Sequence, residues 1–366
     1  MIGMMRPVVS EDAVLAAAAV LRSGWIGQGP RVAALEERFA QLVGAPSAVA
    51  VNSVAAATRL ALAVAGVGPE DEVVTTPLVC TATNHPILEQ FARPVFADVQ
   101  PTTCNIDPAD VVRRVTSRTK AILCTHWGGY PCDLDELNAV AASAGIPVIE
   151  DATDAVGAVY RGRRIGGVST YTAFSFGAVQ LLTTVEGGML TVRPPGDTEA
   201  ARRRRWFGID RVGRRPSSDG YYEFDVTEPG YGYHLSDVAA AIGLAHLDHF
   251  TETLFRRRTI AGRYRSALAD VPGVRLLAAE QDRESACGLF TMRVERRDDF
   301  HRALRERGVE TSVVHVRNDT YTVFGGRRSD LPGMDALEKT YICLPLHGRL
   351  SDEDVEHVIK SVGAGW

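Results

Sequence analysis

Lysine is almost missing from this chain of 366 residues. Only Lys120, Lys339 and Lys360 are present, although lysine and arginine together number 40. Arginine keeps its charge and does not supply the free amine that lysine offers to covalent chemistry. Any reaction that needs a lysine amine is therefore limited to three positions. Lys120 opens an apolar run, and the other two lie far down the chain.

Other absences exclude further classes of protein. The six cysteines show no paired CxxC spacing, so we expect neither a metal site nor a disulfide scaffold. The most apolar stretch, 49–67, is interrupted by Asn52 and Arg59, which argues against a membrane span. Residues 1–14 lack the apolar core of a signal peptide, so we expect a cytoplasmic protein. A net charge of −5 gives no sign of a nucleic-acid partner.

What is present is typical of a globular α/β protein. Short apolar runs alternate with helical patterns such as residues 133–144, and this order predicts a mostly parallel sheet flanked by helices. The runs are 72–75, 94–97, 120–123 and 146–149. Ligands of such sheets bind at the carboxyl ends of the strands. We therefore expect His126 and Asp151, each just past a run, to lie at the functional edge.

The length and the remaining pattern predict two domains. We place a large domain at residues 1–250 and a smaller α+β domain at 251–366, and we leave open that the N-terminal helix packs on the small domain. Further helices are expected at 10–21, 32–43, 237–250, 253–268, 298–307 and 352–362. Further strands are expected at 289–294 and 311–316. Residues 217–232, rich in Gly, Ser, Tyr and Pro, predict an extended loop.

Two segments carry the most information. Residues 150–158 read EDATDAVGA and end a buried strand with a pair of carboxylates. Residues 174–188 read FSFGAVQLLTTVEGG and follow some two dozen residues later. Taken alone, the first segment is also explained as a strand end followed by an aspartate helix cap. Ser175 is likewise explained as a core hydroxyl bonded to backbone.

Together these segments resemble the DegT/DnrJ/StrS family of sugar aminotransferases, which use pyridoxal phosphate (PLP). The resemblance extends from GWIGQGP at 24–30 to LPLH at 344–347. It implies a fold-type-I PLP-transferase architecture and a homodimer with shared active sites. It also implies a small-molecule substrate, a nucleotide-linked keto-sugar or a cyclitol used in secondary-metabolite (antibiotic) or polysaccharide biosynthesis.

The resemblance assigns cofactor roles to particular residues. Asp151 would pair with the pyridine nitrogen of PLP, and Ser175 would bind its phosphate. Residues 51–57, VNSVAAA, would place the phosphate at a helix N-terminus beside Ser53.

Several cofactor positions depart from the family pattern. Val54 replaces a glycine or small residue, Ala55 replaces a threonine, and Cys80 or Thr81 stands where many relatives have a stacking aromatic ring. Gly232 replaces a polar residue that reaches the neighbouring subunit's site. Losing the contacts of positions 55 and 232 would cost roughly 1.5–3 kcal/mol each.

Gln180 stands where the family has the lysine that binds PLP covalently. An amide cannot form that bond or shuttle protons as an amine does. We therefore expect PLP or its amine form, pyridoxamine phosphate (PMP), to bind weakly and non-covalently, or not at all. Acid–base work would fall to His126 or Asp154, although a structural role is slightly favoured for His126.

Substrate residues follow from the resemblance as well. We expect Trp25 and Ile26 from the 24–30 loop and His315 from a pocket-lining segment. The run of arginines at 202–205 reads mostly as solvated surface, and Arg205 is our candidate for a clamp on an anionic substrate. Three functions remain open: a repurposed sugar enzyme, a PLP-independent enzyme using the emptied pocket, and a non-catalytic partner of an active aminotransferase.

Overall fold

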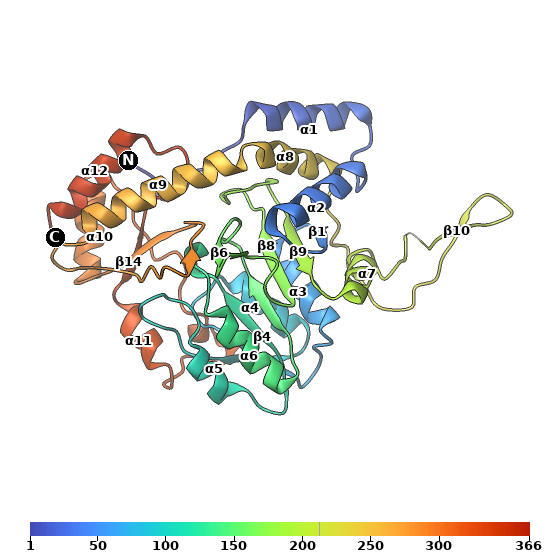
Figure 1. Cartoon of the computed structure of the whole chain (residues 1–366), viewed down its shortest axis with the longest axis horizontal. Helices are drawn as coiled ribbons and strands as arrows, with labels where there is room; N and C mark the ends of the chain where they lie inside the picture. The colour runs from blue at the N-terminus through green and yellow to red at the C-terminus, as the bar shows by residue number, and fades with distance from the viewer. Residues whose placement is uncertain (212) are drawn as a thin grey trace.

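The computed structural model describes residues 1–211 and 213–366. Within this part of the chain, seven strands form one mixed sheet in the order β1-β9-β8-β5-β4-β2-β3 (Figure 1). The strands are β1 (Ala48–Val51), β2 (Glu72–Thr75), β3 (Arg93–Phe96), β4 (Thr119–Thr125), β5 (Val148–Asp151), β8 (Tyr171–Ser175) and β9 (Gly188–Val192). Strands β3, β2, β4, β5 and β8 run parallel, whereas β9 is antiparallel to both of its neighbours.

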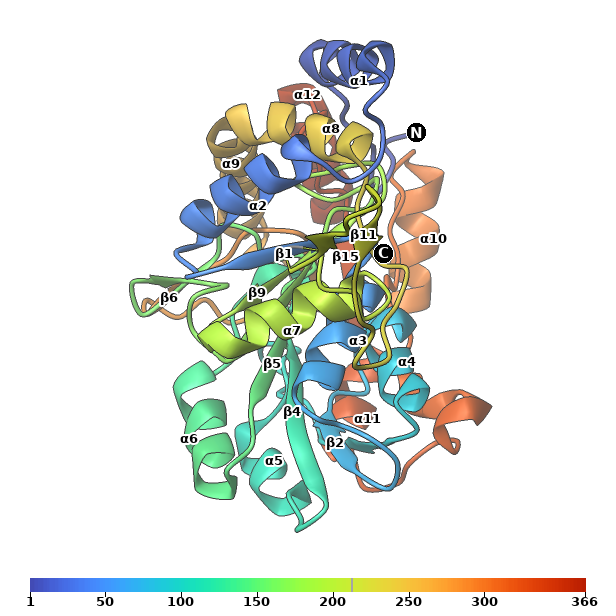
Figure 2. The ribbon, with the colours of Figure 1, turned by 90° about the vertical axis from the view of Figure 1, so that its right-hand side faces the viewer.

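Helices cover both faces of this sheet (Figures 1 and 2). They are α2 (Pro30–Val43), α3 (Val54–Val64), α4 (Thr81–Glu89), α5 (Pro108–Arg114), α6 (Leu134–Ala144) and α7 (Pro195–Arg205). Val74 and Ile122 belong to one core with α2 and α6, whereas Val73 and Leu123 belong to another with α3. Neighbouring strand residues point to opposite faces, so continuous apolar runs are what a doubly covered sheet requires. The predicted α/β class is confirmed.

The C-terminal part builds its own core. Strands β12 (Val274–Leu276), β14 (Phe290–Val294) and β15 (Tyr341–Leu344) form a small antiparallel sheet. It packs with α9 (Phe250–Leu268), α10 (Arg297–Glu306) and α12 (Asp352–Gly363). Helix α9 also contributes Phe250 and Leu254 to the large core, so one helix is shared by both. The boundary at 250/251 stays a prediction.

The N-terminal helix lies apart from the small sheet. Helix α1 (Glu11–Ser23) packs along α8 (Asp237–Asp248), which precedes α9 (Figure 1). The residues before α1 contact the C-terminal part instead: the Ile2 amide donates to the Gly308 carbonyl at 2.8 Å. The leading segment and its helix thus contact different parts of the molecule.

One predicted strand is wrong. Residues 311–316 form only an isolated bridge, between Ser312 and Cys343 of β15. Beyond it, the Tyr341 hydroxyl donates to the His315 carbonyl at 2.5 Å. Residues 217–232 are mostly loop, as predicted, and Tyr222–Glu223 (β11) pairs with Arg215–Pro216 (β10) in a hairpin that projects from the body (Figure 1). Among the described helices, none combines the length and apolarity needed to span a bilayer.

Candidate cofactor and substrate site

Asp151 ends β5 at the carboxyl edge of the sheet and is 1% exposed. Its Oδ1 accepts hydrogen bonds from the Thr153 amide at 2.9 Å and the Thr153 hydroxyl at 2.6 Å. Its Oδ2 accepts from the Thr83 hydroxyl of α4 at 2.5 Å. Donors on both oxygens fix the direction of this carboxylate. The edge therefore carries one oriented, buried carboxylate.

The N-terminus of α3 lies at the same edge. Ser53 caps the helix by accepting a hydrogen bond from the Ala56 amide at 3.1 Å, and the amides of Val54 and Ala55 lack partners within the helix because they are in its first turn. Strand β9 begins against this turn: a Cβ on Gly188 would lie 2.5 Å from the Ser53 carbonyl oxygen. The second glycine of the EGG sequence is thus required by close backbone packing. Free amides at a helix N-terminus suit a phosphate.

Ser175 ends β8 between two buried aromatic rings. The rings of Phe174 and Phe176 pack edge-on against Phe39 at 4.9 and 5.2 Å, on the face of the sheet opposite Ser175. The Ser175 hydroxyl accepts from the Gly177 amide at 3.3 Å and keeps its proton for another acceptor. The FSF sequence therefore uses its two phenylalanines for the core and its serine for the edge.

Gln180 lies in the loop after β8 and is half-buried. In the amide orientation that satisfies its neighbours, its nitrogen donates to Asp154 Oδ1 and to the Thr153 carbonyl, both at 3.2 Å. Sequence reasoning named Gln180 and Asp154 separately, and the structure brings them into direct contact. These two hydrogen bonds hold the side-chain nitrogen of Gln180 in place.

Asp154 is half-buried, and two glycines pack closely against it. A Cβ on Gly288 would lie 2.5 Å from the Asp154 Cβ, and one on Gly129 would lie 2.4 Å from its carbonyl oxygen. Burial raises the pKa of the Asp154 carboxyl to about 6, and the Asp151 carboxylate acts in the same direction, against the opposing charge of Arg257. Asp154 can therefore gain or lose a proton near neutral pH.

Arg257 of α9 was missed by sequence reasoning. It is 6% exposed, and its guanidinium reaches the carbonyls of Val179 and Gly288 at 3.5 Å. Burial lowers its pKa, and the Asp154 carboxylate opposes that effect. No local pattern marks it, because it is one of three consecutive arginines. Thr83 and Thr153 were also missed, although a threonine two residues after an aspartate is a recognisable backbone-turn signal.

His126 lacks the freedom expected of a general base. Its Nδ1 accepts from the Cys132 amide at 3.1 Å, so its Nε2 carries the proton and donates to Glu150 at 2.8 Å. The residue is 1% exposed. Both ring nitrogens are engaged, which favours the structural alternative, and the role as base stays a prediction. His315 packs edge-on against Trp127 at 5.8 Å, and burial lowers its pKa despite the nearby Asp151 carboxylate.

Arg205 is likewise held inside the protein. It is 5% exposed, and its guanidinium donates to Glu36 and to the Ala50 carbonyl. An internal ion pair of this kind favours a structural role, and the substrate clamp stays a prediction. The neighbouring arginines 203 and 204 pair with Glu228, so the run is bound to the protein's own carboxylates.

The other expected residues lie around the edge. Cys80 is the N-cap residue of α4 and makes no capping side-chain bond. Gly232 accepts a 3.3 Å hydrogen bond from the Asn52 side chain, so within its own chain it lies next to the α3 turn. Trp25 and Ile26 are 62% and 53% exposed.

The three lysines lie elsewhere, and all are exposed. Lys120 is at the start of β4, the end of the strand opposite the site. Lys339 follows α11 (Pro332–Glu338), and Lys360 on α12 is 3.7 Å from Glu356. A lysine amine therefore does not reach Asp151 from within this chain.

The sheet order, the flanking helices and the aspartate at the end of β5 define a fold-type-I PLP transferase. A model of the DegT/DnrJ/EryC1/StrS aminotransferase family matches residues 7–363, and the chain belongs to that family. It is 38% identical over 371 residues to the spore coat polysaccharide biosynthesis protein SpsC of Bacillus subtilis, covering 97% of this chain and 95% of SpsC.

Solved structures agree with this assignment. The sugar aminotransferase CalS13 of Micromonospora echinospora superimposes with a TM-score of 0.95 at 36% identity, with both chains fully covered. Spr1654 of Streptococcus pneumoniae, solved in PLP and PMP forms, has a TM-score of 0.92 to each form at 29% identity. Each alignment covers 99% of this chain, and it covers 97% of the Spr1654 chain in the PMP form and 98% in the PLP form.

The residues present fit a PLP-type cofactor at its pyridine nitrogen and at its phosphate. Asp151 offers an anion to a protonated pyridine nitrogen, and the α3 turn with Ser53 and Ser175 offers donors to a phosphate. Bound there, the cofactor supplies an electron sink. Gln180 lies in contact with Thr153 and Asp154, which follow Asp151 in the chain.

Proposed function

We propose that this protein binds PMP or PLP without a covalent bond and acts on a sugar, by a reaction other than ordinary transamination. The contact of the Gln180 amide with Asp154 and the Thr153 carbonyl carries the proposal. The substrate would be a nucleotide-linked keto-sugar or a related cyclitol in polysaccharide or secondary-metabolite biosynthesis. Membership of a sugar aminotransferase family supports the sugar class.

The chemistry follows from what each residue can do. Asp151 would pair with a protonated pyridine nitrogen, because Thr83 and Thr153 fix the direction of its carboxylate. Gln180 cannot capture a carbonyl carbon, but its bond directs the Asp154 carboxyl. With a pKa raised to about 6, that carboxyl holds or moves a proton at Oδ1 or Oδ2.

A shared site in a homodimer is part of the proposal. Trp25 and Ile26 stay exposed on a loop that is nevertheless well fixed, since Asp237 accepts hydrogen bonds from the amides of Gly29 and Val32 at 2.8 and 3.0 Å. An anchored loop that presents two large apolar side chains suits contact with a partner subunit or a substrate.

The test combines cofactor titration with covalent trapping. Purified protein is titrated with PLP and PMP by calorimetry, then reduced with borohydride and weighed by mass spectrometry. We expect saturable binding of either form and no covalent adduct at residue 180. Gln180→Lys is the matched control, because it restores an amine at one position and should be trapped by reduction.

Restoring the lysine alone should not restore turnover. The phosphate side still lacks the contacts replaced at Ala55 and Gly232, which weakens cofactor retention by roughly two to four decades. Adding Ala55→Thr to Gln180→Lys should therefore tighten PLP binding by about tenfold or more. An adduct in the natural protein, or strong amino transfer by Gln180→Lys alone, would contradict the proposal. No binding at about millimolar cofactor would instead favour a PLP-independent enzyme.

A further inference from the structure

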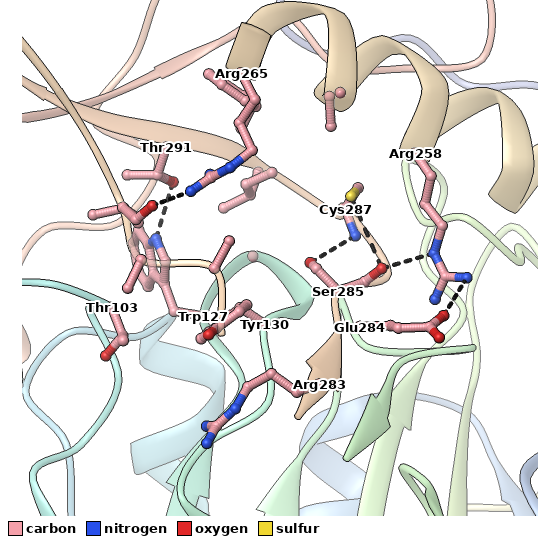
Figure 3. A pocket seen from close by; sticks show the side chains of 18 residues that line it. Thr103, Trp127, Tyr130, Arg258, Arg265, Arg283, Glu284, Ser285, Cys287 and Thr291 are labelled. Carbon is pink, nitrogen blue, oxygen red and sulfur yellow. Dashed lines mark hydrogen bonds and ion pairs between the residues drawn. The ribbon is translucent and has the colours of Figure 1, made fainter. Parts of the chain in front are cut away.

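A cavity lies away from the Asp151 edge. It opens between α9 and residues 277–291, above the turn at residues 127–130, and has a volume of about 310 Å³ (Figure 3). None of Asp151, Asp154, Ser175 or Gln180 is among its lining residues. It is therefore separate from the site proposed to hold the cofactor.

The walls of this cavity are mainly apolar. Trp127, Ala261, Leu277, Leu289 and Phe290 line it. Its volume is about twice that of an engineered 150 Å³ cavity that binds benzene, and it reaches the lower end of the range for small-molecule pockets. One aromatic ring with a short chain is the size of ligand that fits.

The floor is formed by the backbone and is in place without a ligand. The amides of Gly288 and Leu289 donate to the Gly128 carbonyl at 2.9 and 3.2 Å. Gly128 has a φ of 56°, and a Cβ there would lie 3.0 Å from the Leu289 Cβ. Because these bonds already hold the two loops together, ligand binding would not cost the conformational entropy of ordering them.

The three arginines that line the cavity differ in whether a carboxylate pairs with them. Arg258 is paired with Glu284 at 3.0 Å, and Arg283 is paired with Asp133 at 2.8 Å. Arg265 donates to the Leu277 carbonyl, yet no carboxylate lies within ion-pair distance of it in the described parts of the chain. Figure 3 shows Arg265 descending from α9 toward the cavity. One guanidinium on this apolar wall is therefore left without a counter-charge.

Tyr130, another residue that lines the cavity, carries a second polar group. The Tyr130 hydroxyl accepts from the Glu280 amide at 2.9 Å, which leaves its proton free to donate. Burial raises the pKa of this hydroxyl, so it stays a donor at neutral pH. Because Arg258 and Arg283 already have carboxylate partners, a doubly charged phosphate would find one uncompensated cation on these walls. A monocarboxylate with an apolar body fits one cation and one hydroxyl donor.

We propose that this cavity is a binding site for a small apolar monocarboxylate, with the carboxylate on Arg265 and the apolar body against Trp127 and Leu289. The site does not depend on the proposed cofactor chemistry. It adjoins that chemistry through Trp127, whose ring also packs against His315.

The test compares two ligands of the same shape. Calorimetry on the full chain uses 3-phenylpropionate and its neutral twin 3-phenylpropanamide. We expect saturable binding of the acid, with the amide bound at least about tenfold more weakly because a charged hydrogen bond is lost. Arg265→Leu should remove this preference, and Arg263→Leu, on the same helix but bonded to Asp352 outside the cavity, should keep it.

A filled cavity provides a second variant. Ala278→Trp should weaken both ligands by blocking the space, with circular dichroism showing that each variant is folded. Absence of saturable binding of the acid up to about 10 mM, tenfold above a dissociation constant of about 1 mM, would overturn the proposal. Equal binding of acid and amide, or equal effects of the variants at 265 and 263, would overturn it as well.

Discussion

At the scale of single residues, the site differs from its neighbourhood by what surrounds each polar atom. Asp151 and Asp154 are close in sequence, but Asp151 is buried with a donor on each oxygen, whereas Asp154 is half-buried and accepts from the Gln180 amide on one oxygen. Gln180 and Arg205 also differ in burial. The half-buried Gln180 amide donates to Asp154, whereas Arg205 is buried in an ion pair with Glu36. Residue type alone does not tell these cases apart.

Asp154 should make stability depend on pH. Its folded pKa, about 6, lies above the ordinary value, so the folded state binds the proton more tightly and loses stability as pH rises from about 4 to about 6. Asp154→Asn removes this dependence. Relative to the natural protein, the variant should gain up to roughly 3 kcal/mol in free energy of unfolding between those pH values.

Urea unfolding at pH 4.5 and at pH 7 checks this expectation. The exposed Asp248→Asn is the control, since its loss breaks only a surface pair with Arg38. If the difference between Asp154→Asn and the natural protein stays constant with pH, the carboxyl does not titrate in this window.

At the scale of elements, the sequence predicted most of what lies along one stretch of chain. Apolar runs located β2 to β5, because a strand covered on both faces reads as a continuous run. The motif around residue 175 was also local, since alternating side chains place Phe174 and Phe176 on one face. The strand expected at 311–316 is reduced to a single bridge with the distant Cys343, and no local pattern reports where such pairing stops.

The parts of the site that escaped prediction all depend on distant partners. His126 looks like a free base until Cys132 and Glu150 take both of its nitrogens. Arg257 reaches the Gln180 loop from a helix nearly eighty positions further on. No local pattern reports such contacts, because they form only when the sheet and α9 come together.

The start of α3 and the start of β9 should tolerate no added atom. In Gly188→Ala the new Cβ would lie 2.5 Å from the Ser53 carbonyl oxygen and 2.8 Å from the Val54 nitrogen. Neither is a flexible side chain, so we expect a loss of about 1–3 kcal/mol in free energy of unfolding. Phosphate binding at the α3 turn should weaken with it.

Chemical denaturation and phosphate titration measure the two effects. Gly196→Ala is the matched control, because a Cβ there meets nothing within 4 Å and the residue lies in the first turn of α7. A Gly188→Ala variant as stable as Gly196→Ala would show that β9 can move away from α3.

At the scale of the whole molecule, the exposed apolar side chains are unevenly placed. The arm (residues 213–230) projects from the body (Figure 1). Tyr221, Tyr222, Phe224 and Val226 on it are each more than half exposed. Large aromatic side chains on an extended segment with little core of its own mark a surface that another chain covers. The proposed homodimer would bury them.

Replacing two of these side chains should therefore weaken self-association. The variant Tyr222→Ser with Phe224→Ser removes two aromatic anchors, each worth about 1.5–3 kcal/mol when buried, so the dimer dissociation constant should rise by roughly a hundredfold or more. Sedimentation equilibrium measures it. Phe255→Ser, an exposed aromatic on α9 away from the arm, should leave association unchanged. A natural protein that sediments as a monomer at micromolar concentration would contradict the homodimer, and equal behaviour of the two variants would move its interface away from the arm.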